Sequence, residues 1–349
     1  MKVFHIESGL GNQMLSYCEY LAAQFVDPDD RCYIETIVYD IPECNEVICQ
    51  WNGYEIERIF GIQAPNVKSL FDETHWEQVM KEIRESRFWE RNWNYPVYFT
   101  EAFSHAGLSL VNIRGDFEEP SFMTRFSGKK TFKSRLVDSK IGDTLKRWYY
   151  ILSENKKIQK ADNQNKVFFI GSENVFTGQW LSFKYRFNGI EKIDKEIRKI
   201  FCFPAFVNEK DMQMAEFLQT HNSIAIHARR GDMLGYNGNC YKYGYFQRAI
   251  TYIKKRVSDP VFVFFCDPGS VEWCKENGEI FALNFKNDKV FFVDWNKGEN
   301  SFRDMQLMSL CKHAVITNSS FGWWGAYLIK NPDKITVSPD ITINTTHHC

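Results

Sequence analysis

The sequence predicts a two-domain α/β protein whose C-terminal part is built on a parallel, doubly wound sheet. Its C-terminal part alternates short apolar runs with helix-length segments, which is the pattern that such a sheet produces. Its N-terminal part opens in the same way, with an apolar strand, a glycine-containing loop and a helix. A length of 349 residues also exceeds one ordinary core, which favours two domains.

The N-terminal part begins with a predicted strand at 2–6 and a predicted helix from Asn12. The stretch from about 60 to 205 is irregular and rich in aromatic residues, and it predicts no clear elements. The helix is supported by apolar residues at helical spacing, at positions 14, 15, 18, 21, 22 and 25.

Pro204 and the polar run 208–211 predict a domain boundary, which places the domains at 1–205 and 206–349. A Gly/Asn-rich loop is expected at 235–239. The predicted strands of the C-terminal domain are 223–227, 261–266, 290–293, 314–317 and 334–338, and its predicted helices are 243–256, 271–277, 302–312 and 321–329.

Composition excludes several classes of protein. A net charge of −1 argues against a general nucleic-acid binder. The ten cysteines form no C-x-x-C pair and no zinc-like spacing, and several lie in apolar runs, so we expect a reduced, cytoplasmic protein. The N-terminus resembles no leader peptide, and no apolar run approaches the length of a membrane span.

The stretch 125–160 is strongly basic, with eleven Lys and Arg against three acids. A solvated face is the simplest interpretation of such a run. A peripheral contact with an anionic membrane, or with a lipid-pyrophosphate-linked acceptor, is the alternative.

The segment His227-Ala228-Arg229-Arg230-Gly231-Asp232 carries the strongest functional signal. It places two arginines at the end of a buried strand, where their desolvation is unfavourable unless an anion meets them. Arginine presents a planar fork of donors that matches phosphate, and parallel sheets bind ligands at the carboxyl ends of their strands. One interpretation is a pyrophosphate site that uses arginine instead of a metal. The other is an internal salt bridge between an arginine and Asp232.

The segment Ser8-Gly9-Leu10-Gly11-Asn12-Gln13-Met14 is a second candidate site. Its glycines allow a tight turn, and the helix N-terminus offers unpaired N–H groups to an anion. It is not a dinucleotide fingerprint, because Met14 occupies the third glycine position of G-x-G-x-x-G. A turn followed by a helix cap is the alternative.

Two further candidate sites follow strands of the C-terminal domain. At Asn318-Ser319-Ser320 small polar residues open a helix, so donors converge there, although capping alone would explain the first two. Asp267 follows the strand 261–266, where a carboxylate either accepts hydrogen bonds from a guanine edge or caps the next helix.

Taken in this order, these segments resemble the alpha-1,2-fucosyltransferase family, glycosyltransferase family 11. The resemblance spans both ends of the chain, whereas 27–170 contributes almost nothing to it. Residues 8–18 match the family's motif G-G-L-G-N-Q-M-F-Q-Y-A, and residues 227–233 match its motif H-x-R-R-G-D-Y. Residues 178–185 resemble its block G-Y-W-Q-S-E-K-Y-F, and residues 265–273 loosely match its motif F-S-D-D-x-x-W. Residues 308–328 match its motif M-S-x-C-K-H-x-I-x-x-N-S-T-F-S-W-W-x-A-x-L.

Three positions depart from the family's motifs. Ser8 stands in place of a glycine of the first loop. Pro268 replaces the second aspartate, which leaves Asp267 as the only carboxylate for base contacts. Residues 181–183 replace the Q-S-E core of a block that should face the acceptor, so the acceptor's identity is not carried over.

The resemblance implies a GT-B-like α/β fold of two Rossmann-like domains facing a cleft, with an N-terminal acceptor-side domain and a C-terminal domain that binds the donor. It implies inverting transfer of L-fucose from GDP-L-fucose to the 2-hydroxyl of a galactoside or a lipid-linked oligosaccharide, without a metal. The leaving diphosphate gains negative charge, and the expected catalytic residues that stabilise it are Arg229 first and Arg230 second. The other expected donor-binding residues are Gly9, Gly11, Asn12, Gln13, His227 (near guanine or ribose), Asp232, Asp267, Asn318, Ser319 and Ser320, and the expected acceptor-side residues are Trp180 and Lys184.

The sequence does not identify a catalytic base. The displacement needs help in deprotonating the acceptor hydroxyl, or it is driven by the leaving group without a strong base. Asp232, Asp116 and Glu7 are candidates, but Asp232 is better suited to fixing the arginines, and the family has no acid at the Glu7 position. Asp27 and Asp29 spell D-x-D, but they follow a helix and are discounted as a metal site.

Two other functions stay open. One is transfer of another GDP-6-deoxysugar, or formation of another linkage, since arginine-pair motifs also occur in alpha-1,6- and protein-O-fucosyltransferases. The other is a non-catalytic carbohydrate-binding protein, which ten tryptophans and sixteen tyrosines would suit. Two arginines beside a glycine loop are not needed by a lectin, so nucleotide binding separates the carbohydrate-binding protein, whereas analysis of the product linkage separates the other transferases.

Overall fold

The computed structural model describes residues 1–44, 52–90, 96–112, 174–177, 193–231, 234–267 and 269–339, with some positions between 139 and 152. These residues fall into two compact units. The first contains the described residues up to Asn112 and from Asn174 to Pro204, and the second contains the others. Among the described residues, no helix is long and apolar enough to cross a membrane.

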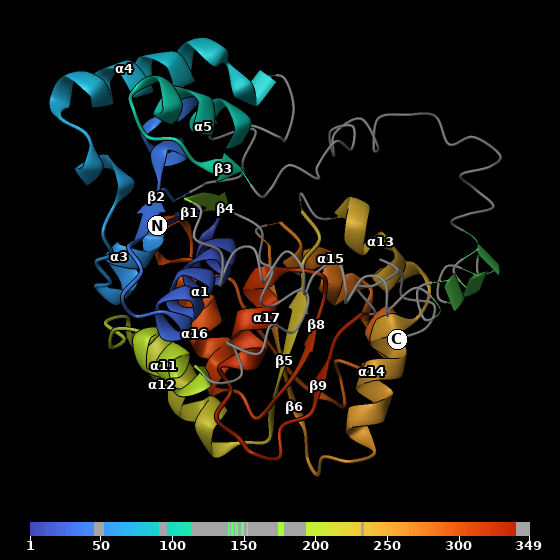
Figure 1. The fold of residues 1–349 in the computed structure, drawn as a ribbon. Coiled ribbons are helices and arrows are strands. Elements are labelled where there is room, and N and C mark those ends of the chain that lie inside the picture. The colour runs from blue at the N-terminus through green and yellow to red at the C-terminus, as the bar shows by residue number, and fades with distance from the viewer. Residues whose placement is uncertain are drawn as a thin grey trace. The chain divides into compact units, whose positions relative to one another are not determined.

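The first unit is built on a four-stranded parallel sheet. Its strands are β1 (Lys2–His5), β2 (Cys32–Glu35), β3 (Val111–Asn112) and β4 (Val175–Thr177), in the order β2-β1-β4-β3 (Figure 1). Its helices are α1 (Leu10–Val26), α3 (Glu55–Phe60), α4 (Glu73–Ser86), α5 (Pro96–His105) and α11 (Asp194–Ile200), with 3-10 turns η1 (Ile37–Asp40), η2 (Pro42–Cys44), η3 (Val67–Leu70) and η4 (Phe88–Glu90). The buried residues Val3, Phe99, Phe103 and Phe176 belong to a core that joins β1 and β4 to α4 and α5.

The second unit is a five-stranded parallel sheet with helices on both faces (Figure 1). Its strands are β5 (Ser223–Ala228), β6 (Val261–Cys266), β7 (Lys289–Val293), β8 (His313–Ile316) and β9 (Thr336–Val337), in the order β7-β6-β5-β8-β9. Its helices are α12 (Glu209–Thr220), α13 (Leu234–Lys242), α14 (Tyr245–Lys254), α15 (Val271–Glu276), α16 (Phe302–Leu310) and α17 (Ser320–Tyr327), with 3-10 turns η5 (Gly278–Phe281) and η6 (Gly298–Asn300).

The side chains of β5 explain how this sheet is covered on both faces. Successive residues of a strand point to opposite faces. Ile224 and Ile226 join the core that contains α13 and α14, whereas Ala225 joins the core that contains α12, α16 and α17. His227, two residues after Ala225, is therefore directed toward the α17 face.

The α/β class and the parallel sheets predicted from the sequence are confirmed. The loop expected at 235–239 is wrong, because helix α13 occupies it. Buried Asn237, Cys240 and Tyr241 show why, since tertiary packing outweighs the poor helix propensity of the glycines and asparagines. The polar run 208–211 is a helix start, where the Asn208 side chain accepts a hydrogen bond from the Lys210 N–H at 2.8 Å.

The turn between β1 and α1 depends on Ser8, not on the glycines that follow it. Ser8 has φ 64°, in the left-handed region, whereas Gly9 has φ −76°. A residue with a Cβ loses about 1–2 kcal/mol in this region. The Ser8 carbonyl is held by the Gln13 side-chain amide at 2.9 Å and by the Tyr39 hydroxyl at 2.8 Å.

Ser8→Gly is therefore expected to raise the free energy of unfolding by about 0.5–1 kcal/mol. Removing the backbone strain outweighs the greater entropy that glycine gives the unfolded chain. Urea denaturation measures the change, with Ser104→Gly in α5 as a control that should destabilise the protein. An unfolding midpoint for Ser8→Gly below that of the parent would contradict the strain.

Candidate functional site

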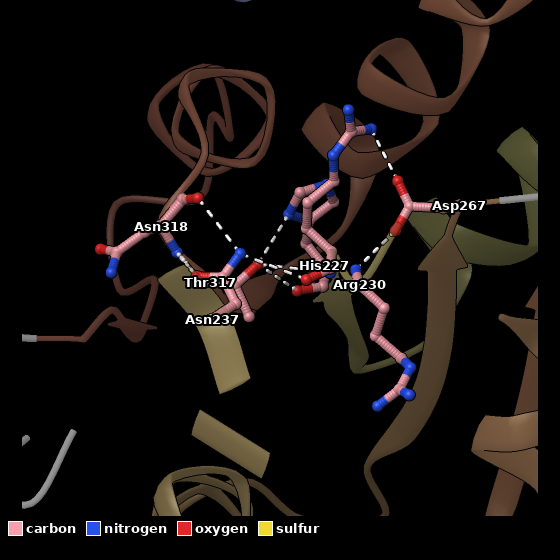
Figure 2. Close-up of polar contacts among 7 residues, drawn as sticks. His227, Arg230, Asn237, Asp267, Thr317 and Asn318 are labelled. Atoms are coloured by element: carbon pink, nitrogen blue, oxygen red, sulfur yellow. Dashed lines mark hydrogen bonds and ion pairs between the residues drawn. The ribbon is translucent and has the colours of Figure 1, made fainter. Parts of the chain in front are cut away.

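The second unit brings polar residues together where β5 and β8 end (Figure 2). His227 on β5 is paired in register with Ile316 on β8, so the residues that follow both strands leave the sheet at the same level. The strand order also reverses here, because β6 and β7 lie on one side of β5 and β8 and β9 on the other. Doubly wound sheets bind ligands at the carboxyl ends of the strands at such a switch point.

Asp267 holds the arginine pair from the end of the neighbouring strand β6. The Arg229 Nη1 atom lies 2.7 Å from Asp267 Oδ1, and the Arg230 backbone N–H donates to Oδ2 at 2.5 Å. The Arg229 and Asp267 side chains are 20% and 8% exposed, so the ion pair is mostly shielded from water. Gly231 lets the carboxylate approach, since a Cβ there would lie 3.3 Å from Asp267 Cγ. Among the described residues, Asp267 thus fixes the arginines, a role for which the sequence favours Asp232.

The Arg230 side chain points away from this carboxylate (Figure 2). Its guanidinium carbon lies 3.4 Å from the ring centroid of Trp273 and 5.0 Å from that of Tyr241. An arginine over an aromatic face gains a cation–π attraction. The two neighbouring arginines therefore have different partners, as the alternation at a strand end predicts.

Asn237 ties the ends of β5 and β8 together from helix α13. Its side-chain N–H groups donate to the carbonyl of Arg229 at 3.2 Å and to that of Asn318 at 3.3 Å, and its Oδ1 accepts from the Asn318 N–H at 3.0 Å. Thr317 adds a second tie, because its hydroxyl accepts from the Arg229 N–H at 3.3 Å and donates to the His227 carbonyl at 3.2 Å. Sequence reasoning missed both residues, since only the pairing of β5 with β8 brings their partners within reach.

His227 is an uncharged, buried imidazole beside the arginines. Burial first, and then the charge of Arg229, lower its pKa to about 3. Its ring stacks on Phe321 with centroids 5.9 Å apart. The ring fits against α17 only because position 322 is glycine, where a Cβ would lie 2.4 Å from His227 Nδ1.

Gly322→Ala is expected to displace His227 or helix α17 and to destabilise the protein by about 1–3 kcal/mol. Urea denaturation measures the change. Gly238→Ala is the matched control, since a Cβ at that position in α13 meets nothing within 4 Å. A Gly322→Ala protein with the parent's stability would contradict the packing described here.

The start of α1 in the first unit holds the residues of the other glycine segment. Gly9 is the residue before the helix, and Gly11, Asn12 and Gln13 lie in its first turn. The Gln13 amide is engaged inside the unit, because it donates to the carbonyls of Ser8 and Gly53, both at 2.9 Å, and accepts from the Glu55 N–H at 2.8 Å. Gln13 thus fixes the turn, while the N–H groups of Asn12 and Gln13 donate to the Gly9 carbonyl at 2.9 and 3.1 Å.

The start of helix α17 does not show the side-chain cap that the sequence suggests. Ser319 precedes the helix, but its hydroxyl makes no capping hydrogen bond within the described part of the chain. Asp27 does follow a helix, as expected, and forms the end of α1. The structure, where it is described, contains no group of three or more His, Cys, Asp or Glu side chains suited to a metal ion.

Several residues singled out from the sequence lie outside the described residues. These are Asp232, Pro268, the candidate base Asp116, the acceptor-side residues Trp180 and Lys184, and most of the basic stretch 125–160. Their predicted roles stay predictions.

Comparisons with known proteins find a family match and several similar proteins. Residues 130–347 of this chain match the family described as Glycosyl transferase family 11. An alpha-1,2-colitosyltransferase of Escherichia coli is 37% identical over 172 residues, which cover 47% of this chain and 54% of that protein. The O-antigen biosynthesis glycosyltransferase WbnK of Escherichia coli is 36% identical over 125 residues, which cover 34% of this chain and 38% of that protein.

A mammalian relative shows similarity of the same kind. The galactoside 2-alpha-L-fucosyltransferase SEC1 of Bos taurus is 30% identical over 143 residues, which cover 38% of this chain and 37% of that protein. The chain thus spans about half the length of these relatives, or less.

Proposed function

Because this chain belongs to glycosyltransferase family 11, we propose that it transfers L-fucose from GDP-L-fucose to the 2-hydroxyl of a galactoside. The observation that carries this proposal is the arginine cluster at the ends of β5 and β8, where a doubly wound sheet binds its ligand. Similarity to an alpha-1,2-colitosyltransferase and to an O-antigen biosynthesis glycosyltransferase supports a role in a bacterial surface polysaccharide or oligosaccharide.

The donor diphosphate is proposed to bind against Arg229. Its guanidinium has five N–H donors, and Asp267 orients it from one side. As the bond to the sugar breaks, negative charge develops on the β-phosphate, and a fixed cation stabilises that charge more than it stabilises the bound donor. Arg230, held over Trp273, keeps a second positive charge close by.

We further propose a GT-B arrangement, with the first unit on the acceptor side of a cleft and the second on the donor side. The start of α1, with Gly9, Gly11 and Asn12, would then present the positive end of its helix dipole to the diphosphate. The acceptor hydroxyl attacks the anomeric carbon opposite the departing GDP, so the configuration inverts.

Chelation with EDTA is expected to leave transfer activity almost unchanged. Arginine and a helix terminus neutralise the leaving group in this mechanism, so a divalent cation is not needed at the diphosphate. Radiolabelled transfer with and without EDTA measures this, with a metal-dependent glycosyltransferase as a positive control. A drop of about tenfold that Mn²⁺ or Mg²⁺ restores would refute the metal-free mechanism and return Asp27 and Asp29 to consideration.

A second donor deserves equal testing, because one relative is an alpha-1,2-colitosyltransferase. The test of function is incubation with a panel of GDP-sugars and β-galactoside acceptors, with GDP release and product linkage read by mass spectrometry and NMR. We expect GDP-L-fucose to give an α-1,2-linked product. Preference for another GDP-6-deoxysugar would change the donor assignment, and GDP binding without transfer to any acceptor would point to a non-catalytic protein.

A further inference from the structure

The chain between the end of β6 and helix α15 holds both arginines that follow β5, each by a different means. Asp267, directly after β6, forms the ion pair with the Arg229 guanidinium and accepts a hydrogen bond from the Arg230 backbone N–H. Trp273, within α15, lies against the Arg230 guanidinium, whose carbon is 3.4 Å from the ring centroid. Both arginines therefore depend on one short stretch of chain.

The partners of the two arginines differ in charge. A carboxylate compensates the charge of the guanidinium that it pairs with, whereas an aromatic face attracts a guanidinium through its quadrupole and leaves the positive charge in place. The Arg229–Asp267 pair is thus close to neutral. The Arg230 side chain is directed away from Asp267 (Figure 2), and no described acidic side chain forms an ion pair with it. Within the described part of the chain, Arg230 therefore carries the net positive charge of the pair.

Trp273 is itself held in place by the core of the second unit. Its ring meets the ring of Tyr241 edge-on, with centroids 5.4 Å apart and planes at 87°, and the ring of Phe281 at 6.5 Å and 79°. Tyr241 and Phe281 are buried members of the core beside α13 and α14. The Trp273 carbonyl accepts from the Asn277 side-chain amide at 2.7 Å. A ring fixed in this way gives the flexible side chain of Arg230 one orientation.

The stacked pair is open to a ligand. Arg230 and Trp273 are both partly exposed, and Gly231, which follows Arg230, is exposed. Arg230 lies just after β5, at the carboxyl edge of a doubly wound sheet, where such sheets bind nucleotides. All of these residues belong to the second unit.

We propose that Trp273 is the positioning residue for Arg230 and that it keeps Arg230 as the uncompensated cation for the donor diphosphate. This inference rests on the proposed function and assigns the two arginines different parts in it. Arg229, fixed by Asp267, supplies directed hydrogen bonds with little net charge. Arg230, fixed by Trp273, supplies the charge, which matters most as the bond to the sugar breaks and its electron pair leaves with GDP.

Trp273→Leu tests the proposal, since it keeps an apolar side chain against the core and removes the aromatic face. We expect kcat to fall about 10-fold and the KM for the GDP-sugar to stay within about twofold of the parent. Trp273→Phe keeps a weaker aromatic face, so kcat should fall only about threefold. A folded Trp273→Leu protein with the parent's kcat would overturn the proposal.

Tyr252→Leu is the matched control for this change. Tyr252 lies against the Arg256 guanidinium at 3.5 Å, in a stack of the same kind near the end of α14. Removing this aromatic face should leave kcat at the parent's value. An equal loss in Tyr252→Leu and Trp273→Leu would mean that the effect is not specific to Arg230, and it would overturn the proposal.

A double-mutant cycle separates the positioning of Arg230 from a merely structural role. Arg230→Gln should lower kcat at least as much as Trp273→Leu does, because it removes the charge itself. In a protein that already carries Arg230→Gln, Trp273→Leu should change kcat by less than about twofold, since the two changes remove one interaction. The full loss in both backgrounds would show that Trp273 supports only the fold, and it would overturn the proposal.

Fluorination of the Trp273 ring supplies a readout that leaves the indole in place. Each fluorine withdraws electron density from the ring face, so tryptophans with increasing numbers of ring fluorines at position 273 attract the guanidinium less and less. We expect kcat to fall stepwise along this series. The same analogues at Trp76, which lies under Lys68 in the first unit, should leave kcat unchanged. A constant kcat along the series at position 273 would overturn the proposal.

Failure of the proposed function gives a different result from failure of this inference. In the first case the unaltered protein transfers sugar from none of the GDP-sugars in the panel. In the second case the unaltered protein is active, and either the Trp273 variants keep its kcat or their losses persist in the Arg230→Gln background.

Discussion

Arg229→Lys is expected to lower the kcat of transfer by about 10²–10³-fold while the protein folds normally. Lysine keeps the charge but loses the planar fork, so it can neither keep the ion pair with Asp267 in place nor meet the β-phosphate with two parallel bonds. Removing one donor that acts in the transition state loses about 2.7–4 kcal/mol. Steady-state kinetics with the GDP-sugar measure the loss.

Arg256→Lys is the matched control for this change. Arg256 lies just after α14, where its guanidinium rests on Tyr252 at 3.5 Å, far in the sequence from either strand end of the site. It should transfer at the parent's rate. Turnover near the parent's in a folded Arg229→Lys protein would remove Arg229 from the catalytic role.

Asp267→Asn is expected to lower kcat/KM about 100-fold and to change the affinities for GDP and ADP by the same factor. The carboxylate holds both Arg229 Nη1 and the Arg230 N–H, and the amide keeps its shape but not its charge. The arginines then lose their fixed geometry, which matters for any diphosphate. Calorimetry with both nucleotides measures the ratio.

The alternative role of Asp267, reading the guanine edge, predicts the opposite ligand dependence. A site built for those hydrogen bonds would lose GDP affinity selectively and leave ADP binding unchanged. Asp259→Asn is the control, because it breaks an exposed ion pair with Lys289 that contributes little. A selective loss of GDP binding in Asp267→Asn would therefore indicate that the carboxylate contacts the guanine edge.

The arginine segment could be predicted because its signal is local. An apolar run predicts β5, and two arginines directly after it predict an anion site at the edge of a parallel sheet. The family resemblance rests on the same short segments. The partner of Arg229 could not be predicted with equal ease, because Asp267 reaches it only through the pairing of β5 with β6.

The missed residues share a physical reason. Asn237 lies in a segment whose glycines and asparagines favour a loop. Its side-chain amide nevertheless forms hydrogen bonds with the backbone of Asn318, 81 residues away. The His5–Glu35 contact likewise spans 30 residues and needs the register of β1 on β2. Ser8 shows the converse, since a loop that contains Gly9 places its left-handed residue at the serine instead.

Arg229, fixed by Asp267 at the ends of β5 and β8, is proposed to bind the donor's diphosphate. A crystal structure with GDP, or with a non-hydrolysable GDP-sugar, tests it most directly. We expect a β-phosphate oxygen within hydrogen-bond distance of the Arg229 guanidinium, at the carboxyl edge of the second unit's sheet. A nucleotide bound elsewhere, with Arg229 paired to Asp267 alone, would contradict it.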